Sequence, residues 1–178
     1  MDWQERAAAV RLLLMDVDGV LTDGRLYFVP GPDGQMHETK AFDSQDGIAL
    51  RWLTWKGIEL GLISGRDSPA TVARAEQIGF TYIYQGHLEK VPILEEIVAR
   101  SGRALNQIGF IGDDLTDAVI MRRVGFAVAT ANARPEVKQI AHVVTQASGG
   151  RGAVREAAEM ILRAQGCWEE ILHKYEVG

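Results

Sequence analysis

Short apolar runs alternate along the chain with stretches in which apolar residues recur every three or four positions. The strand-like runs are Arg11 to Met15, Glu59 to Ile63, Thr81 to Tyr84, Gln107 to Ile111, Phe126 to Val128 and Val143 to Thr145. The stretches between them have the period of amphipathic helices. Strands that alternate with helices are typical of βαβ units. The pattern therefore predicts an α/β fold built on a parallel sheet.

Several of the predicted helices have recognisable limits or apolar faces. One begins after Ser64-Gly65-Arg66, with Ser68 as its N-cap, Pro69 as its first residue and Gly79 after its end. Two others carry apolar stripes that should pack on the sheet, namely Val91, Leu94 and Val98, and Val154, Ala158, Ile161 and Leu162. The last segment, Cys167 to Tyr175, also has an apolar side, and it is either a docking tail or an extra core helix.

One segment departs from the alternation of strands and helices. Residues 25–29 and 35–42 resemble two strands, and residues 30–34 between them are rich in proline and glycine. We predict a β-hairpin insertion over about residues 25–42, within a single domain that spans residues 1–178. Because two strands alone are marginally stable in water, this apolar hairpin should pack on its own domain or on another subunit, and contact with another subunit is favoured.

Composition narrows the classes of partner. With 178 residues and 47% hydrophobic content the chain can bury one sizeable core. A net charge of -5 offers no electrostatic footprint for nucleic acid or for an anionic membrane surface, so the expected ligand is small. The single cysteine allows no internal disulfide. The first residues lack the basic and apolar regions of a signal peptide, and a cytoplasmic protein is expected.

The first apolar run ends at two acidic residues, Asp16 and Asp18. Parallel strands usually open at their carboxyl ends into the crevice that holds the ligand. Two carboxylates at such a place repel each other unless a divalent cation lies between them or one of them stays protonated. The pair can also be a turn that merely caps a strand, since Asp and Gly favour turns.

Polar groups follow three further predicted strands. The four polar segments are Asp16-Val17-Asp18-Gly19-Val20, Ser64-Gly65, Lys90 after Gln85-Gly86, and Gly112-Asp113-Asp114-Leu115-Thr116-Asp117. Together they supply a carboxylate nucleophile, a second acid, cation ligands and a lysine, which are the parts that phosphoryl transfer requires. Each part has an ordinary alternative, such as a loop start for Ser64, a solvated side chain for Lys90, or helix N-capping for Asp114 and Asp117.

In the order of these motifs the chain resembles the haloacid dehalogenase superfamily of aspartyl phosphotransferases. The segments that carry the resemblance are residues 16–24, 41–47, 64–66, 112–117 and 149–156. The resemblance implies a Rossmann-like core with helices on both faces and no separate cap domain. Within the superfamily the chain looks most like the phosphatases of 3-deoxy-D-manno-octulosonate 8-phosphate (Kdo 8-phosphate). That likeness implies a Mg²⁺-dependent step of lipopolysaccharide biosynthesis and a homotetramer whose hairpins form a central barrel.

The resemblance also assigns roles by position. Asp16 would be the nucleophile and a magnesium ligand, Asp18 the general acid and base that also offers its main-chain carbonyl to the metal, and Asp113 the third ligand. Ser64, Gly65 and Lys90 would bind the phosphoryl group. The residues implied in substrate binding are Asp43, Ser44, Gln45, Asp46, Gly47, Arg51, Arg66 and Arg74. Candidates for supporting roles are Asp114 and Asp117, and Arg151 is expected to reach a neighbouring subunit's site.

Two other functions are compatible with these motifs. Phosphatases of nine-carbon sialic-type acid 9-phosphates have similar motifs and a similar hairpin. Noncatalytic domains of this kind also work beside nucleotide-sugar synthetases, where they serve assembly. The presence of Asp16, Asp18, Lys90 and Asp113 together argues against a purely structural role, because a scaffold needs none of them.

Overall fold

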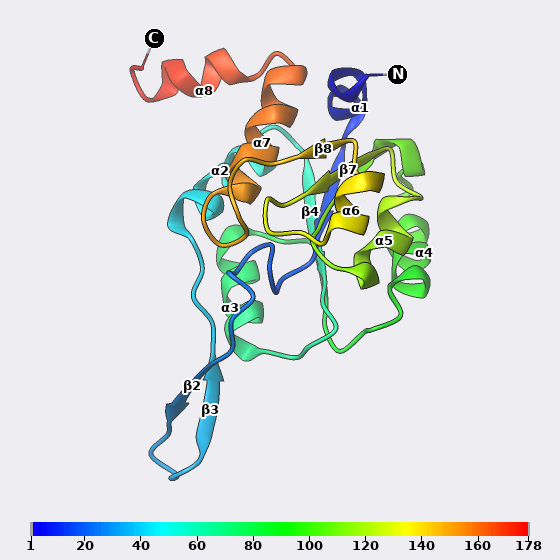
Figure 1. The fold of residues 1–178 in the computed structure, drawn as a ribbon. Coiled ribbons are helices and arrows are strands. Elements are labelled where there is room, and N and C mark those ends of the chain that lie inside the picture. Colours follow the sequence, from blue (N-terminus) through cyan, green and yellow to red (C-terminus); the bar gives the residue numbers. More distant parts are fainter. Residues whose placement is uncertain (1, 178) are drawn as a thin grey trace.

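A computed structural model describes residues 2–177 and contains a six-stranded parallel sheet (Figure 1). The strands are β1 (Leu12–Met15), β4 (Glu59–Ile63), β5 (Tyr82–Tyr84), β6 (Ile108–Gly112), β7 (Phe126–Ala129) and β8 (Val143–Val144). Their order across the sheet is β5-β4-β1-β6-β7-β8. The predicted α/β class is confirmed. Several strand limits differ from the prediction by one residue. One of them is the start of β6, because Gln107 closes a short 3₁₀ turn, Leu105–Gln107, and the strand begins after it.

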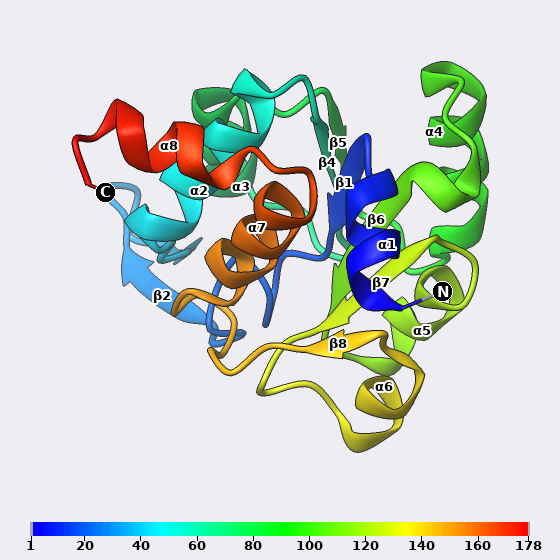
Figure 2. The ribbon, with the colours of Figure 1, turned by 90° about the horizontal axis from the view of Figure 1, so that it is seen from above.

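Helices cover both faces of the sheet (Figures 1 and 2). One face packs against α1 (Trp3–Ala9), α2 (Ser44–Trp55), α3 (Pro69–Ile78) and α7 (Ala153–Ala164). The other face packs against α4 (Lys90–Ser101), α5 (Leu115–Met121) and α6 (Pro135–Ile140). Successive side chains of a strand point to opposite faces, so Leu13 and Met15 of β1 enter the first core while Leu12 and Leu14 enter the second. Burial on both faces explains why β1 is apolar throughout.

The limits of α3 agree with the sequence and Ser68 occupies the N-cap position, but its side chain does not make the capping bond. Pro69 is the first residue, and Gly79 ends the helix in the left-handed conformation with a φ of 99°. The Ser68 hydroxyl makes no capping hydrogen bond, since it is buried without a partner while the Ser68 amide donates to the side chain of Gln85. The apolar stripe of α4 is partly as predicted, since Leu94 is buried and Val98 packs on the same core, but the buried side is centred on Ile93, Leu94 and Ile97.

The insertion after β1 is a two-stranded antiparallel hairpin of β2 (Tyr27–Pro30) and β3 (Met36–Thr39). It extends away from the sheet and its helices (Figure 1). The second strand is shorter than predicted, since residues 40–42 are not in a strand. Within residues 2–177 no cap domain accompanies the hairpin, as predicted.

The C-terminal segment forms a last helix, α8 (Trp168–Lys174). Its Trp168 and Ile171 are buried, and the ring of Trp168 meets the ring of Trp52 from α2 edge-on at 5.9 Å. The segment is therefore an extra core helix. None of the described helices is both long enough and apolar enough to cross a bilayer.

Candidate active site

The site lies where β1 and β6 end side by side. Each of these two strands begins one half of the sheet, and the crevice between such halves is where doubly wound folds bind ligands. Asp16 follows β1 and donates its amide to the carbonyl of Ile111 at 3.0 Å. Asp113 follows β6 directly. The pairing of two strands that are distant in sequence thus brings two of the predicted carboxylates to one edge.

Three carboxylates form a cluster at this edge. Asp16, Asp113 and Asp117 each offer an oxygen, and these oxygens all lie within 4.8 Å of one another. One oxygen of Asp113, Oδ1, is buried and has no hydrogen-bond partner. Gly19 has a φ of +90°, and a Cβ at that position would overlap the Asp113 carboxylate. Oxygen donors that converge with one of them unsatisfied suit a hard divalent cation such as Mg²⁺.

Lys90 closes the cluster from the first turn of α4. Its ammonium donates to Asp16 Oδ1 at 2.6 Å and to Asp117 Oδ1 at 2.7 Å. Burial alone would lower the pKa of Lys90, but the charges of Asp117 and Asp16 outweigh it and raise that pKa. Lys90 is therefore a fixed positive charge beside the proposed nucleophile, and the solvated alternative does not apply.

The acidic groups hold protons more tightly than free carboxyls do. Burial and the charge of Asp117 raise the pKa of Asp16 to about 6, against the opposing effect of Lys90. Burial, together with Asp117 and Asp16, raises the pKa of Asp113 to about 8. The cluster carries more negative charge than one lysine neutralises, so it favours a further proton or cation.

Asp117 supports the cluster with both of its oxygens. Oδ1 accepts from Lys90, and Oδ2 accepts from the amides of Asp113 at 2.9 Å and Asp114 at 3.1 Å. Asp114 is the N-cap of α5 and accepts from the Leu115 amide at 2.7 Å. The capping alternative is therefore confirmed for Asp114, while Asp117 combines capping with an ion pair.

Ser64 directly follows β4, the strand next to β1, at the same edge of the sheet. It is buried, and its hydroxyl oxygen accepts from the Arg66 amide at 3.2 Å. A Cβ at Gly65 would approach the side chain of Leu88 to 2.8 Å. The phosphate-binding role of Ser64 and Gly65 remains a prediction that is consistent with this position.

Asp18 lies apart from the three-carboxylate cluster and has its own partners. Lys40 donates to its Oδ1, and Arg66 Nε lies 3.8 Å from its Oδ2. Sequence reasoning missed Lys40. The available signal was its position directly before Ala41, where one of the quoted motifs begins.

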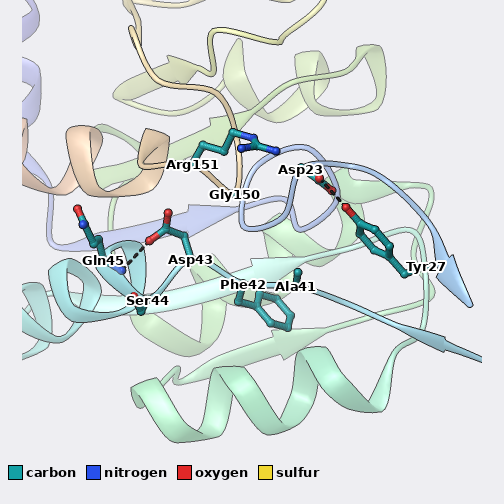
Figure 3. Close-up of a pocket in the computed structure, with 9 residues that line it drawn as sticks. All are labelled: Asp23, Tyr27, Ala41, Phe42, Asp43, Ser44, Gln45, Gly150 and Arg151. Atoms are coloured by element: carbon teal, nitrogen blue, oxygen red, sulfur yellow. Dashed lines mark hydrogen bonds between the residues drawn. The ribbon is translucent and has the colours of Figure 1, made fainter. Parts of the chain in front are cut away.

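A cavity of about 420 Å³ opens at the base of the hairpin (Figure 3). Its lining residues are Asp23, Tyr27, Ala41, Phe42, Asp43, Ser44, Gln45, Gly150 and Arg151. Asp43 caps α2 by accepting from the Gln45 amide at 2.6 Å, while the Tyr27 hydroxyl donates to Asp23 at 2.8 Å. Arg151 of the same chain lines this cavity opposite Asp43, and its expected reach into a neighbouring subunit remains a prediction.

Comparison with known proteins agrees with this geometry. A family of haloacid dehalogenase-like hydrolases matches residues 70–156. The Kdo 8-phosphate phosphatase KdsC of Yersinia pestis is 43% identical over 161 residues, which cover 90% of this chain and 84% of that protein. The enzyme of Escherichia coli K12 is 39% identical over 165 residues, covering 93% and 86%. The chain belongs to the Kdo 8-phosphate phosphatase family.

Solved structures of this family share the whole fold. A probable YrbI family phosphatase from Pseudomonas syringae pv. phaseolica superposes with a TM-score of 0.93 at 41% identity, covering 99% of this chain and 98% of that one. The Moraxella catarrhalis enzyme, at 35% identity and a TM-score of 0.91, covers 97% of both chains. That structure is a complex with a magnesium ion, a phosphate ion and a Kdo molecule.

The residues that the family resemblance implies in substrate binding do not all lie together. Asp43, Ser44 and Gln45 line the cavity, and Arg66 lies beside Asp18. Gly47, Arg51 and Arg74 line a second recess of about 190 Å³ between α2 and α3, which shares Ser44 with the cavity.

Two residues of that recess, Gly47 and Arg74, are packed directly against each other. A Cβ at Gly47 would overlap the Arg74 guanidinium. Arg74 Nη2 also donates to the Asp43 carbonyl at 3.3 Å. Arg74 therefore braces the segment that leads into the cavity, while substrate contact by Gly47, Arg51 and Arg74 remains a prediction.

Asp46 turns away from both cavities. Its side chain is buried, and Oδ1 accepts from the Arg155 amide in the first turn of α7 at 2.7 Å. Burial raises the pKa of Asp46 to about 6, although the amides of Arg155 and Gly152 oppose this. The observed contact gives Asp46 a role in joining α2 to α7.

The glycine segment before α7, which this family resemblance includes, packs directly on the loop after β1. The Gly150 amide donates to the Val20 carbonyl at 2.9 Å. A Cβ at Gly149 would overlap the Gly19 carbonyl, and that carbonyl also accepts from Asn132 Nδ2 at 3.0 Å. Only a residue without a side chain allows this backbone approach, so the segment fixes the loop that carries Asp16 and Asp18.

Proposed function

We propose that this chain is a Mg²⁺-dependent phosphomonoesterase that hydrolyses Kdo 8-phosphate to Kdo and phosphate in lipopolysaccharide biosynthesis. The observation that supports this proposal most directly is the cluster of Asp16, Asp113, Asp117 and Lys90 beyond the end of β1. One oxygen of Asp113 in this cluster is buried without a hydrogen-bond partner. Membership in the Kdo 8-phosphate phosphatase family supports the same reaction and substrate. We place the protein in the cytoplasm and treat residues 1–178 as one domain.

The residues that would hold Mg²⁺ are Asp16, Asp113 and the main-chain carbonyl of Asp18. Both oxygens of Asp117 already accept hydrogen bonds, so Asp117 holds Lys90 and the Asp113 loop in place. When bound, the cation offsets the charge of the carboxylates and polarises the phosphoryl oxygens.

The chain's own residues carry out two successive displacements. An Asp16 oxygen attacks phosphorus in line, the bond from phosphorus to the sugar oxygen breaks, and Asp18 gives its proton to that oxygen. Asp18 then takes a proton from water, whose oxygen attacks the aspartyl phosphate and releases inorganic phosphate and free Asp16. Lys90 and Ser64 bind the phosphoryl oxygens and stabilise the charge that they carry.

The sugar acid is assigned to the cavity at the base of the hairpin. Its volume of about 420 Å³ falls in the range of small-molecule sites. Arg66 at the site and Arg151 across the cavity are cations that can pair with the substrate carboxylate. Arg51 and Arg74 are assigned a secondary part, because they lie in the recess between α2 and α3.

Replacement of Asp16 by Asn tests the reaction. We expect the variant to fold with unchanged circular dichroism and to lose turnover of Kdo 8-phosphate by at least about a thousandfold, because an amide oxygen is a poor nucleophile. Substantial phosphatase activity in the variant contradicts the assignment of the nucleophile.

A substrate panel tests the specificity. The catalytic efficiency with Kdo 8-phosphate should exceed that with a nine-carbon acid 9-phosphate and with hexose phosphates, since discrimination is a difference in transition-state binding. Preference for the nine-carbon acid would favour the sialic-type alternative. Inactivity of the wild-type protein towards every phosphate, p-nitrophenyl phosphate included, would favour the noncatalytic alternative.

Assembly through the hairpin is the second part of the proposal. The large apolar side chains of the hairpin are between 38% and 61% exposed, namely Leu26, Tyr27, Phe28, Val29 and Met36. An apolar surface of this kind on two isolated strands is suited to cover by other copies of the chain. We propose a homotetramer in which the hairpins pack together.

A further inference from the structure

Lys40 is buried although it follows an exposed strand. Its side chain is 2% exposed, whereas β2 is exposed throughout and β3 is exposed in its first half. The ammonium donates to Asp18 Oδ1 and lies 3.6 Å from Glu38 Oε1. Residues 38 and 40 are two apart in an extended segment and therefore point to the same side, towards the body of the protein.

Arg66 completes a group of four charged side chains. Its Nη2 donates to Glu38 Oε2, and its Nε lies 3.8 Å from Asp18 Oδ2. Two cations thus alternate with two carboxylates, and they come from three separate segments of the chain. The remaining oxygen of Glu38, Oε1, is buried and makes no hydrogen bond, so the ammonium of Lys40 is the charge that faces it.

Stability is a weak reason for this arrangement. Taking a lysine out of water carries a desolvation cost that ion pairs only approximately repay. Ordering its long side chain costs further entropy. The contacts point to a geometric role, since Lys40 binds one oxygen of Asp18 and limits the rotation of the carboxyl group. Oδ2 makes no hydrogen bond within residues 2–177, with Arg66 Nε 3.8 Å away, and is the oxygen left to carry the transferred proton.

We propose that Lys40 is a positioning residue that holds Asp18 in the orientation required for proton transfer to the leaving group. The proposal rests on the proposed function, because it needs Asp18 to be the general acid. Glu38 and Arg66 act indirectly: Glu38 faces the ammonium of Lys40, and Arg66 binds Glu38 and so holds the hairpin strand against the site.

Aryl phosphates of nearly the same shape test the proposal without involving the sugar. The phenolate that leaves phenyl phosphate is basic and needs a proton from a general acid. The p-nitrophenolate that leaves p-nitrophenyl phosphate is far less basic and depends much less on such a proton. In Lys40→Met we expect kcat/KM for phenyl phosphate to fall by about ten- to a hundredfold more than for p-nitrophenyl phosphate, as part of a general-acid contribution is lost. Lys40→Arg, which keeps a charged donor, should recover part of that loss.

A double substitution identifies the route of the effect. In the Asp18→Asn background Lys40→Met should cause no further loss with phenyl phosphate, because a residue that acts through Asp18 has nothing left to position. Lys56→Met is the matched control, since Lys56 also pairs with a carboxylate, that of Glu170, far from the site. Its kinetics should equal those of the wild type.

Four outcomes would overturn the proposal. They are equal losses with both aryl phosphates, losses confined to Kdo 8-phosphate, unchanged kinetics, and an undiminished Lys40 effect in the Asp18→Asn background. An inactive wild-type protein would instead refute the proposed function. If Lys40→Met does not fold, Glu38→Gln is measured in its place, and it should change the ratio of the two aryl phosphates in the same direction by a smaller factor.

Discussion

At the scale of single residues, the negative charges of the carboxylate cluster are only partly neutralised by the buried Lys90. Lys90 bridges Asp16 and Asp117, yet Asp113 retains an unpartnered oxygen among these carboxylates. Removing Lys90 would leave two buried carboxylates without their cation, which typically costs about 3–5 kcal/mol. The same imbalance makes the binding of a divalent cation dependent on pH.

Magnesium should stabilise the protein more at high pH than at low pH. The folded-state pKa values of Asp16 and Asp113 are raised to about 6 and about 8, so the neutral forms contribute stability that is lost as the pH rises through those values. The cation binds the ionised forms and offsets this loss. The shift in Tm on adding MgCl₂ should therefore be larger at pH 8.5 than at pH 6, as measured by scanning calorimetry.

Asp113→Asn is the control for this measurement, because it keeps the size of the side chain and removes its charge. The variant should show a much smaller shift in Tm with MgCl₂ at pH 8.5. A shift in the wild type that is equal at both pH values, or larger at pH 6, would contradict the assignment of the cation to these carboxylates.

At the scale of elements, one buried carboxyl joins two helices. Asp46 belongs to α2 and accepts from the amide of Arg155 in α7, while Gly149 and Gly150 before α7 contact the loop after β1. These contacts connect α2, through the start of α7, to the loop that carries Asp16. The contact with Arg155 satisfies only Oδ1 of the Asp46 carboxyl, which is 1% exposed, and Oδ2 is buried without a partner, so the ionised form is costly.

Asp46→Asn should stabilise the protein at neutral pH relative to the wild type. Because burial raises the pKa of Asp46 to about 6, the stability that the neutral acid supplies is fully present below about pH 4 and is lost as the pH rises through 6. A shift of about two pKa units corresponds to roughly 3 kcal/mol. Asparagine keeps the acceptor for Arg155 without the buried charge.

Urea unfolding of both proteins at pH 4.5 and pH 8 measures this effect. The free energy of unfolding of Asp46→Asn, minus that of the wild type, should be more positive at pH 8 than at pH 4.5 by about 2 kcal/mol. A difference that does not change with pH would show that the buried carboxyl is not neutral in the folded protein at pH 4.5.

At the scale of the whole molecule, the sheet order places the site and the hairpin places the assembly surface. The two halves of the sheet meet at β1 and β6, and each of these strands is followed directly by an aspartate, Asp16 or Asp113. The hairpin extends away from the body (Figure 1). Lys40, directly after β3, binds Asp18, and Glu38 in β3 accepts from Arg66. Assembly and catalysis therefore share one region of the molecule.

Polar substitutions on the hairpin should reduce the mass in solution. Phe28 is 53% exposed and Met36 is 61% exposed. We expect the wild type to scatter light as four chains and Phe28→Ser with Met36→Ser to approach the 19.6 kDa of one chain, because the apolar contact is removed. Leu105→Ser, at a 40% exposed leucine outside the hairpin, should leave the mass unchanged. A wild type that scatters as one chain contradicts the assembly proposal.

Sequence reasoning located the groups that come directly after strands. Asp16, Ser64 and Asp113 follow apolar runs, and parallel strands bring their carboxyl ends to one edge whatever their order. The fold class and the absence of a cap in residues 2–177 follow from the same alternation and from the family resemblance. Local patterns were less reliable for caps, as the unpartnered Ser68 hydroxyl shows, because tertiary contacts compete for the same polar groups.

What the sequence by itself determined was the kind of chemistry, since residue types and their places after strands persist in any packing of this sheet. Only the tertiary structure decided the pairings. Lys40 meets Asp18, Lys90 joins Asp16 to Asp117, and Asp46 reaches α7 instead of the cavity. These partners are separated by 22 to 109 residues. A side chain's choice among distant partners depends on helix rotation and loop path, which hydrophobic periodicity does not specify.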